Sequence, residues 1–84
     1  MIEIYGKQYC VWCEKAKALL IERGIPYKYY TIGEDVDLET IKEKFPGVKT
    51  VPIILVNGFM IGGYESLEGY VEESISGYAH DIQS

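Results

Sequence analysis

The two cysteines of this chain, Cys10 and Cys13, are separated by only two residues. A disulfide between them would close a very small loop, which removes little entropy from the unfolded chain. The pair therefore cannot hold distant segments together, and the 84 residues must be stabilised by one modest apolar core. With 48% hydrophobic and 25% charged residues, the composition is typical of a folded domain, which we expect to span residues 1–84.

Runs of β-prone residues predict four strands, over residues 2–5, 27–32, 53–56 and 59–61. The last two are joined by Asn57-Gly58, a dipeptide favoured in two-residue type I′ hairpin turns. With three intervening helices, the predicted order is β-α-β-α-β-β-α, in which the first β-α-β forms a right-handed parallel crossover. The expected fold is an α/β domain with a mixed four-stranded sheet and three helices.

The three predicted helices follow from apolar residues spaced three and four positions apart. The first covers residues 11–23 and ends before Gly24; its apolar face contains Cys13, Ala16, Leu19, Leu20 and Arg23. The second is capped by Asp37 and carries Leu38, Ile41 and Phe45. The third is capped by Ser66, and its apolar face contains Leu67, Tyr70, Val71, Ile75 and Tyr78.

The chain has a formal charge of −5, and its charges are unevenly placed. All eight basic residues lie between Lys7 and Lys49, whereas residues 50–84 contain five acidic residues and no basic ones. Without a basic stripe, the chain is a poor partner for nucleic acid or for an anionic membrane. No apolar run is long enough to span a bilayer, and the first residues do not resemble a signal peptide. We therefore expect a cytoplasmic protein whose thiols are kept reduced.

Cys10 is expected at the start of the helix over residues 11–23, where free backbone N–H groups and the helix dipole favour an anion. Lys7, three residues earlier, adds a positive charge near the same sulfur. Because the thiolate is the reactive form, Cys10 is predicted to be the exposed nucleophile. Cys13 should face inward with Ala16, and is predicted to be the resolving thiol that attacks a mixed disulfide on Cys10.

Three other roles for the cysteines stay open. A structural zinc ion usually needs four Cys or His ligands, and only His80 could join the pair. The cysteines could instead be small apolar core residues. In the third role, the Cys10 residues of two chains would bridge an iron–sulfur cluster together with ligands from elsewhere. A redox role is favoured because the C-x-x-C pair follows a strand and precedes an amphipathic helix.

A second segment, Thr50-Val51-Pro52, precedes the strand over residues 53–56. Proline at the first residue of a strand cannot donate a hydrogen bond to the sheet. A cis Val51–Pro52 bond would leave the backbone groups of Val51 free for an extended peptide ligand. Proline statistics alone favour a trans bond at the start of an edge strand.

Three separated motifs together resemble a dithiol glutaredoxin: Lys7-x-x-Cys10-Val11-Trp12-Cys13, Thr50-Val51-Pro52 and Gly62-Gly63-Tyr64-Glu65. The resemblance covers nearly the whole chain and implies a thioredoxin-like fold. It implies an enzyme that reduces protein disulfides and glutathione mixed disulfides, with glutathione as the reducing co-substrate and no tightly bound cofactor. It also implies that Cys10 is the nucleophile, Cys13 the resolving thiol and Pro52 a cis proline.

The resemblance also implies a glutathione site beside Pro52, formed by Lys7, Trp12, Val51, Gly63, Tyr64 and Glu65. Lys7 would pair with the glycyl carboxylate, with Lys49 as a second candidate, and the Val51 backbone would bind the cysteinyl part. The start of the last helix offers N–H groups to the γ-glutamyl carboxylate. Glu65 would accept a hydrogen bond from the ammonium group.

Four positions depart from the usual family pattern. Val11 and Trp12 replace the Pro and Tyr of Cys-Pro-Tyr-Cys, Glu65 replaces Asp, and Tyr64 replaces a small Cys or Ser and is expected to narrow the groove. Valine after the first cysteine also occurs in NrdH-type redoxins, which take electrons from thioredoxin reductase. Their usual Trp-Ser-Gly-Phe-Arg-Pro segment is here Gly-Tyr-Glu-Ser-Leu. The alternatives are thus an NrdH-type redoxin and a glutathione-ligated iron–sulfur cluster carrier.

The resemblance also sets the expected partners. These are glutathione and disulfide-bearing proteins, among which ribonucleotide reductase is an expectation from the family alone. The chain is expected to act as a monomer.

Overall fold

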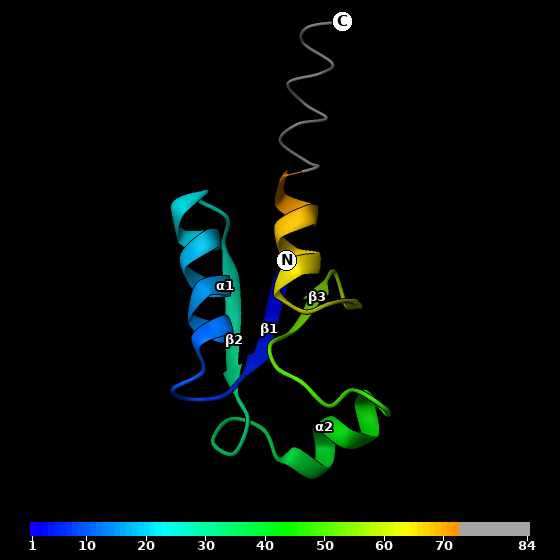
Figure 1. Cartoon of the computed structure of the whole chain (residues 1–84). Helices are drawn as coiled ribbons and strands as arrows, with labels where there is room; N and C mark the ends of the chain where they lie inside the picture. The colour runs from blue at the N-terminus through cyan, green and yellow to red at the C-terminus, as the bar shows by residue number, and fades with distance from the viewer. Residues whose placement is uncertain (73–84) are drawn as a thin grey trace, which may run out of the picture.

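The computed structural model describes residues 1–72, and its elements follow the predicted order (Figure 1). The strands are β1 (Ile2–Gly6), β2 (Tyr27–Thr31), β3 (Ile53–Val56) and β4 (Phe59–Gly62). The helices are α1 (Val11–Glu22), α2 (Leu38–Lys44) and a C-terminal helical segment over residues 64–72. Every predicted strand and helix is therefore present in the described part of the chain.

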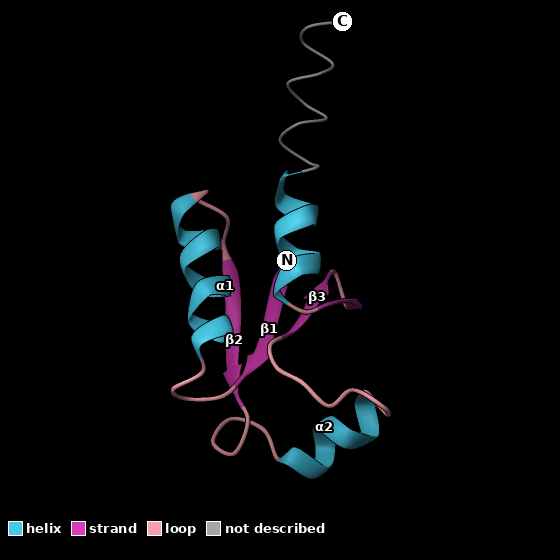
Figure 2. Ribbon diagram, in the orientation of Figure 1, coloured by secondary structure: helices cyan, strands magenta, loops and turns pink. Residues whose placement is uncertain are grey.

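The four strands form one mixed sheet in the order β2-β1-β3-β4 (Figure 2). β1 is parallel to β2, with Ile4 opposite Tyr29, and α1 lies in the crossover between them. β3 is antiparallel to β1, with Ile54 opposite Ile4, and β4 is antiparallel to β3. This topology confirms the predicted α/β fold with a parallel crossover followed by a hairpin.

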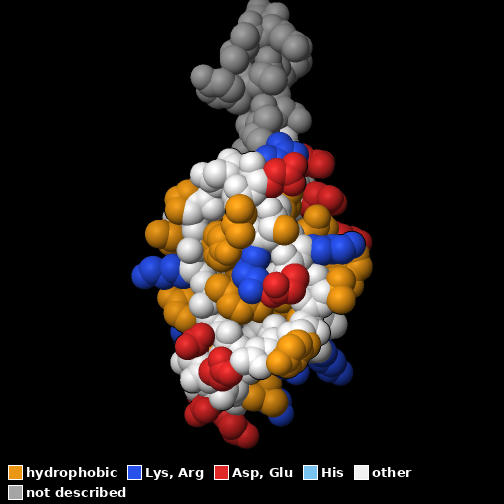
Figure 3. Space-filling model, turned by 90° about the vertical axis from the view of Figure 1, so that its left-hand side faces the viewer, with side chains coloured by type: hydrophobic (Ala, Val, Ile, Leu, Met, Phe, Trp, Pro, Cys, Tyr) orange, Lys and Arg blue, Asp and Glu red, His pale blue; other side chains and the backbone are white. Residues whose placement is uncertain are grey.

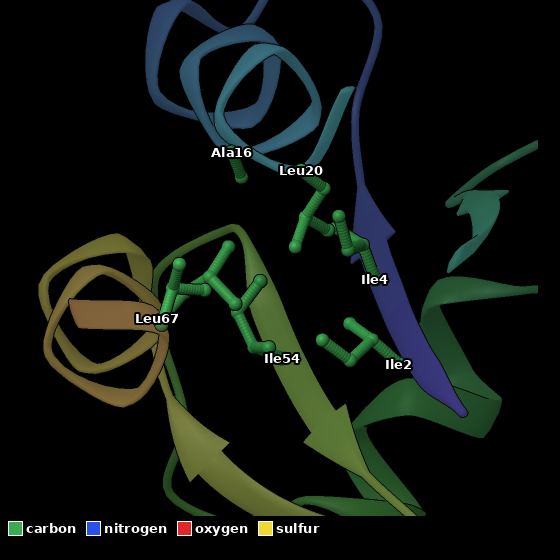
Figure 4. Close-up of a cluster of buried hydrophobic side chains, with 7 residues drawn as sticks. Ile2, Ile4, Ala16, Leu20, Ile54 and Leu67 are labelled. Atoms are coloured by element: carbon green, nitrogen blue, oxygen red, sulfur yellow. The ribbon is translucent and has the colours of Figure 1, made fainter. Parts of the chain in front are cut away.

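Apolar side chains form a cluster on each face of the sheet. On one face, α1 and the C-terminal helical segment cover the strands, and their side chains meet those of β1 and β3 (Figure 4). The buried members of this cluster are Ile2, Ile4, Ala16, Leu20, Ile54, Leu67 and Val71. The opposite face carries a smaller cluster of Tyr5, Ile41, Ile53 and Leu55. Neighbouring strand residues serve opposite faces because side chains alternate along a strand.

The end of α1 has the glycine-terminated geometry that the sequence predicted. Gly24 adopts a left-handed conformation with φ +68°, which glycine tolerates at little cost. The N–H groups of Gly24 and Ile25 donate to the carbonyls of Ile21 and Leu20 at 3.1 and 2.9 Å, the two bonds of a Schellman motif. Because the helix stops at Glu22, the prediction that Arg23 extends its apolar face was wrong, and Arg23 is exposed.

The predicted turn between β3 and β4 is confirmed, whereas the predicted cap of α2 is only partly correct. Asn57 and Gly58 have φ of 52° and 88°, so both central residues adopt the positive φ of a type I′ turn. Asp37 occupies the N-cap of α2 as predicted, but its side chain makes no capping hydrogen bond. The helix position was thus correct, and the proposed capping interaction was not.

The C-terminal helical segment begins earlier than predicted. The N–H of Leu67 donates to the carbonyl of Gly63 at 3.0 Å, so Gly63 and not Ser66 is in the N-cap position. On the predicted apolar face, Leu67 and Val71 are buried, whereas Tyr70 is 40% exposed.

Two other residues predicted for that apolar face, Ile75 and Tyr78, lie outside the described residues. Within residues 1–72, no helix has the length and hydropathy that crossing a membrane requires.

Candidate active site

Cys10 occupies the N-cap of α1, the position predicted for it. Its backbone is extended (φ −104°, ψ 115°), and its Sγ accepts a hydrogen bond from the N–H of Cys13 at 3.3 Å. The Cys10 carbonyl accepts the first helical hydrogen bond, from the N–H of Glu14 at 3.0 Å. The sulfur is therefore held at the N-terminus of α1, where the helix favours the anion that attacks disulfides.

Cys13 lies one turn into α1 and has no exposed surface, as predicted. Burial, together with a hydrogen bond to Cys10, raises the pKa of the Cys13 thiol above its usual value. Hydrogen bonds from the Lys7 backbone and the Tyr29 side chain act in the opposite direction on this pKa. Cys10 is half-buried rather than fully exposed as predicted, yet it is more accessible than Cys13, which is the asymmetry that two-step thiol exchange requires.

Gly6, at the end of β1, leaves room for the buried sulfur. A methyl group on its Cα would lie 2.8 Å from the Sγ of Cys13 and would also collide with the Tyr29 hydroxyl. That hydroxyl donates to the Lys7 carbonyl at 3.1 Å. The sequence gave no signal for these contacts, because a glycine before a loop and a tyrosine in a strand have ordinary structural explanations.

The Val51–Pro52 peptide bond is cis, as the resemblance implied. Pro52 is buried and Val51 half-buried, and both line a cavity of about 340 Å³. The other lining residues come from α1, from the loop before β3 and from the start of the C-terminal helical segment: Trp12, Thr50, Gly63, Tyr64, Glu65 and Ser66. All predicted site residues other than Lys7 and the two cysteines therefore line one cavity.

Two aromatic side chains meet at this cavity. The ring centroids of Trp12 and Tyr64 are 5.4 Å apart with an interplanar angle of 47°, a favourable geometry for an aromatic pair. The Nζ of Lys15 lies 4.5 Å from the Trp12 ring centroid, within cation–π range. Tyr64 thus fills space beside Trp12 that a small Cys or Ser would leave open.

Lys7 is exposed and lines a different cavity, of about 260 Å³. Lys42 and Lys49 line the same cavity, so three lysine side chains border it. Thr50 and Val51 line both cavities, which therefore adjoin each other. The sequence did not single out Lys42, because only the folded chain brings the last turn of α2 beside the loop containing Lys49.

The surface around Cys10 is apolar. Tyr9 is 97% exposed and Val11 is 66% exposed, and both line a shallow hollow beside Cys10. Figure 3 shows the α1 side of the molecule, where acidic and basic side chains are interspersed with hydrophobic ones. A disulfide would therefore approach Cys10 over an apolar surface, and neither positive nor negative charge predominates on this side of the molecule.

Metal ligation was an alternative for the cysteines. Within residues 1–72, no group of three or more His, Cys, Asp or Glu side chains is placed to hold a metal ion. His80, the only further zinc ligand suggested by the sequence, lies outside the described residues.

A family model described as Glutaredoxin matches residues 2–61. The chain belongs to the glutaredoxin family. The matched range contains Cys10, Cys13 and the cis Pro52. This glutaredoxin therefore belongs to the thioredoxin-like superfamily.

Curated relatives of this glutaredoxin differ in length. A probable glutaredoxin from Synechocystis is 39% identical over 69 residues, which cover 81% of this chain and 63% of that protein. A hybrid peroxiredoxin from Haemophilus influenzae is 35% identical over 69 residues, covering 82% of this chain and 28% of that protein. The chain thus spans less than two thirds of the length of both relatives.

Solved structures confirm the fold. Reduced glutaredoxin from Escherichia coli has a TM-score of 0.72 and 32% identity, and the match covers 89% of this chain and 96% of that one. A glutaredoxin–glutathione complex from buckwheat has a TM-score of 0.71 and 27% identity, covering 84% of this chain and 68% of that one.

Proposed function

We propose that this glutaredoxin uses glutathione to reduce protein disulfides and glutathione mixed disulfides. The observation that carries the proposal is the pair of adjoining cavities that share Thr50 and Val51. One cavity contains three lysines, and the other is bordered by the start of the C-terminal helical segment. The first is lined by Lys7, three residues before Cys10, and the second by Trp12, two residues after it.

Glutathione has a carboxylate at each end, and its γ-glutamyl end also carries an ammonium group. The glycyl carboxylate fits the cavity bordered by Lys7, Lys42 and Lys49, because charge-assisted hydrogen bonds to a carboxylate are the strong ones. The γ-glutamyl carboxylate fits the N-terminus of the C-terminal helical segment, where backbone N–H groups have no helical partner. Glu65 is exposed at that end and accepts from the ammonium group.

The middle of glutathione then lies along Val51, next to the cis peptide bond. The Val51 backbone N–H and C=O hydrogen-bond the cysteinyl part and bring its sulfur toward Cys10. Trp12 and Tyr64 cover the γ-glutamyl half. The glutathione bound in the buckwheat complex supports this assignment, because that chain shares the fold at 27% identity.

The reaction on a glutathione mixed disulfide needs only Cys10. Its thiolate attacks the sulfur of glutathione, the target thiol leaves, and a Cys10–glutathione disulfide forms. A second glutathione thiolate attacks this disulfide, which releases oxidised glutathione and regenerates Cys10.

The reaction on a protein disulfide needs both cysteines. Cys10 attacks one sulfur and forms a mixed disulfide with the target, and Cys13 then attacks Cys10 and releases the reduced target. Glutathione afterwards reduces the Cys10–Cys13 disulfide. The targets are proposed by class alone, and a place in the cytoplasm and a role with ribonucleotide reductase stay predictions.

The deciding experiment compares electron donors for the purified, oxidised protein. One arm supplies glutathione, glutathione reductase and NADPH; the other supplies thioredoxin reductase and NADPH. We expect turnover in the first arm and little in the second. Turnover in the second arm alone would replace this proposal with the NrdH-type alternative, and a visible absorption band in protein purified without thiol would favour the iron–sulfur carrier.

A further inference from the structure

The proposed reaction leaves one polar contact of the resolving thiol without a role. The Tyr29 hydroxyl donates to the Lys7 carbonyl at 3.1 Å, and it lies beside the Cys13 sulfur because both atoms crowd the Cα of Gly6. Burial, together with a hydrogen bond to Cys13, raises the pKa of the Tyr29 phenol, and the same hydrogen bond lowers the pKa of the Cys13 thiol. A phenol that donates to a neighbouring thiolate stabilises the charged form of the thiol in this way.

Tyr29 also borders an open part of the structure. Tyr29 lines a cavity of about 460 Å³ on the β2 side of the loop before Cys10. The other lining residues are Lys7, Gln8, Tyr9, Glu14, Lys17 and Thr31. Cys13 itself has no exposed surface. Tyr29 therefore lies between a fully buried sulfur and a polar cavity that is separate from the two proposed for glutathione and shares only Lys7 with one of them.

We propose that Tyr29 assists the resolving step, by donating a hydrogen bond to the Cys13 sulfur as its thiolate forms and attacks Cys10. In the resting thiol the hydroxyl donates to the Lys7 carbonyl, and rotation about its C–O bond redirects the donor to the sulfur. The inference rests on the proposed roles of the two cysteines, but not on glutathione as the electron donor.

The assisted step is a thiol–disulfide exchange between Cys13 and the mixed disulfide on Cys10. Cys13 loses its proton to solvent, and its thiolate forms a bond to the Cys10 sulfur of the mixed disulfide. The bond between Cys10 and the target sulfur breaks, and the target leaves as a thiolate that takes up a proton. Cys13 is oxidised, the target sulfur is reduced, and Cys10 remains in a disulfide. Tyr29 keeps its proton throughout, so it acts as a hydrogen-bond donor and not as a base.

The titratable groups that face this pair are few in the described residues. Cys10 faces Cys13 directly. Glu14 and Lys17 border Tyr29 from α1; they pair with each other at 2.6 Å, and the Lys17 Nζ is 4.4 Å from the Tyr29 ring centroid. Lys7 borders the same cavity from the loop. Because Glu14 and Lys17 carry opposite charges and pair with each other, their effects on Tyr29 largely offset each other.

The test uses reduced protein and dithiobis(nitrobenzoate), a disulfide whose released thiol is coloured. Attack by Cys10 releases one coloured thiol, and resolution by Cys13 releases a second. In Tyr29→Phe we expect an unchanged first phase and a second phase slower by about three- to tenfold below the pKa of Cys13, because one hydrogen bond to a developing charge is lost. At higher pH the two proteins should converge, since the thiolate is then formed in both.

Two control variants make the outcome specific. Tyr30→Phe removes a hydroxyl from the next residue of β2, where it donates to Glu3 at 3.4 Å, and should leave both phases unchanged. Cys13→Ser should abolish the second phase; if it does not, the cysteine roles are wrong and the inference fails with them. Equal slowing of both phases in Tyr29→Phe would indicate a packing role and overturn the proposal, as would an unchanged second phase.

Discussion

The Cα of Gly6 faces the sulfur of Cys13 so closely that a methyl group added to it would lie 2.8 Å from the Sγ. Both residues are buried, one at the end of β1 and the other in the first turn of α1. The position of the resolving thiol is therefore set by close approach of its sulfur to the backbone of the strand.

Gly6→Ala should destabilise the protein by roughly 1–3 kcal/mol, because the methyl group overpacks against Cys13 and Tyr29. Gly69→Ala is the matched control. Its added methyl group has nothing within 4 Å, and it lies in the C-terminal helical segment, where alanine is worth about 0.5–1 kcal/mol more than glycine. Urea unfolding of both reduced variants checks the opposite signs. Equal stability of Gly6→Ala and wild type would show that β1 and α1 can shift apart to accommodate the methyl group without loss of stability.

The two cysteines should have different mutant phenotypes. Cys10→Ser should abolish all thiol exchange, because the accessible nucleophile is lost. Cys13→Ser should still reduce glutathione mixed disulfides, which needs one thiol, but should lose reduction of protein disulfides. Parallel assays on the two substrate classes measure this. Equal loss in both mutants on a mixed disulfide would contradict the assigned roles.

The raised pKa of Cys13 makes stability depend on pH in a defined direction. The native state holds the thiol proton more tightly than the unfolded state, whose thiol titrates near ~8.5. The contribution is therefore fully present below that pH and is lost as pH rises through the native pKa. We expect the free energy of unfolding of the reduced protein to fall between about pH 8.5 and 10, before tyrosines titrate in the unfolded chain.

Cys13→Ala provides the control for this pH dependence. Its absolute stability will differ because a buried side chain is truncated, so the comparison is between slopes. The slope of unfolding free energy against pH should be shallower in the variant. Identical slopes would mean that Cys13 does not carry the effect.

Local chemistry made most of the fold predictable from sequence. Asn57-Gly58 requires positive φ at both residues, and only a tight hairpin uses that geometry. Gly24 similarly marked the end of α1. The positions of the two cysteines were predictable from the expected start of the helix, which places Cys10 at the N-cap and Cys13 one turn in, on the buried face with Ala16.

Features that depend on distant contacts could not be predicted in this way. Ser66 looks like a helix cap in sequence, but the chain enters the helix at Gly63, and residue 66 becomes part of the first turn. Tyr29 gains its polar role only because parallel pairing of β2 with β1 brings it beside Gly6 and Cys13. Lys42 joins the site through the placement of α2, which no local pattern encodes.

Lys7 tests the proposed glutathione site most directly. Lys7→Ala should reduce the use of glutathione by a few-fold to about tenfold, because an exposed charge pair is worth roughly 0.2–1 kcal/mol and a charge-assisted hydrogen bond somewhat more. Lys28→Ala is the matched control, since Lys28 is an exposed lysine of β2 that does not line the cavity containing Lys7, Lys42 and Lys49. Steady-state kinetics with glutathione as the varied substrate measures the difference.

A truncated thiol separates the two roles open to Lys7, which also lies close to the cysteines in the chain. γ-Glutamylcysteine lacks the glycyl carboxylate, so wild type and Lys7→Ala should differ much less with it than with glutathione. Equal loss with both thiols would mean that Lys7 acts on the Cys10 sulfur and not on the ligand. No loss with either would leave Lys42 and Lys49 as the only lysines bordering that cavity, and the glycyl end of the proposed site would have to be reassigned to them.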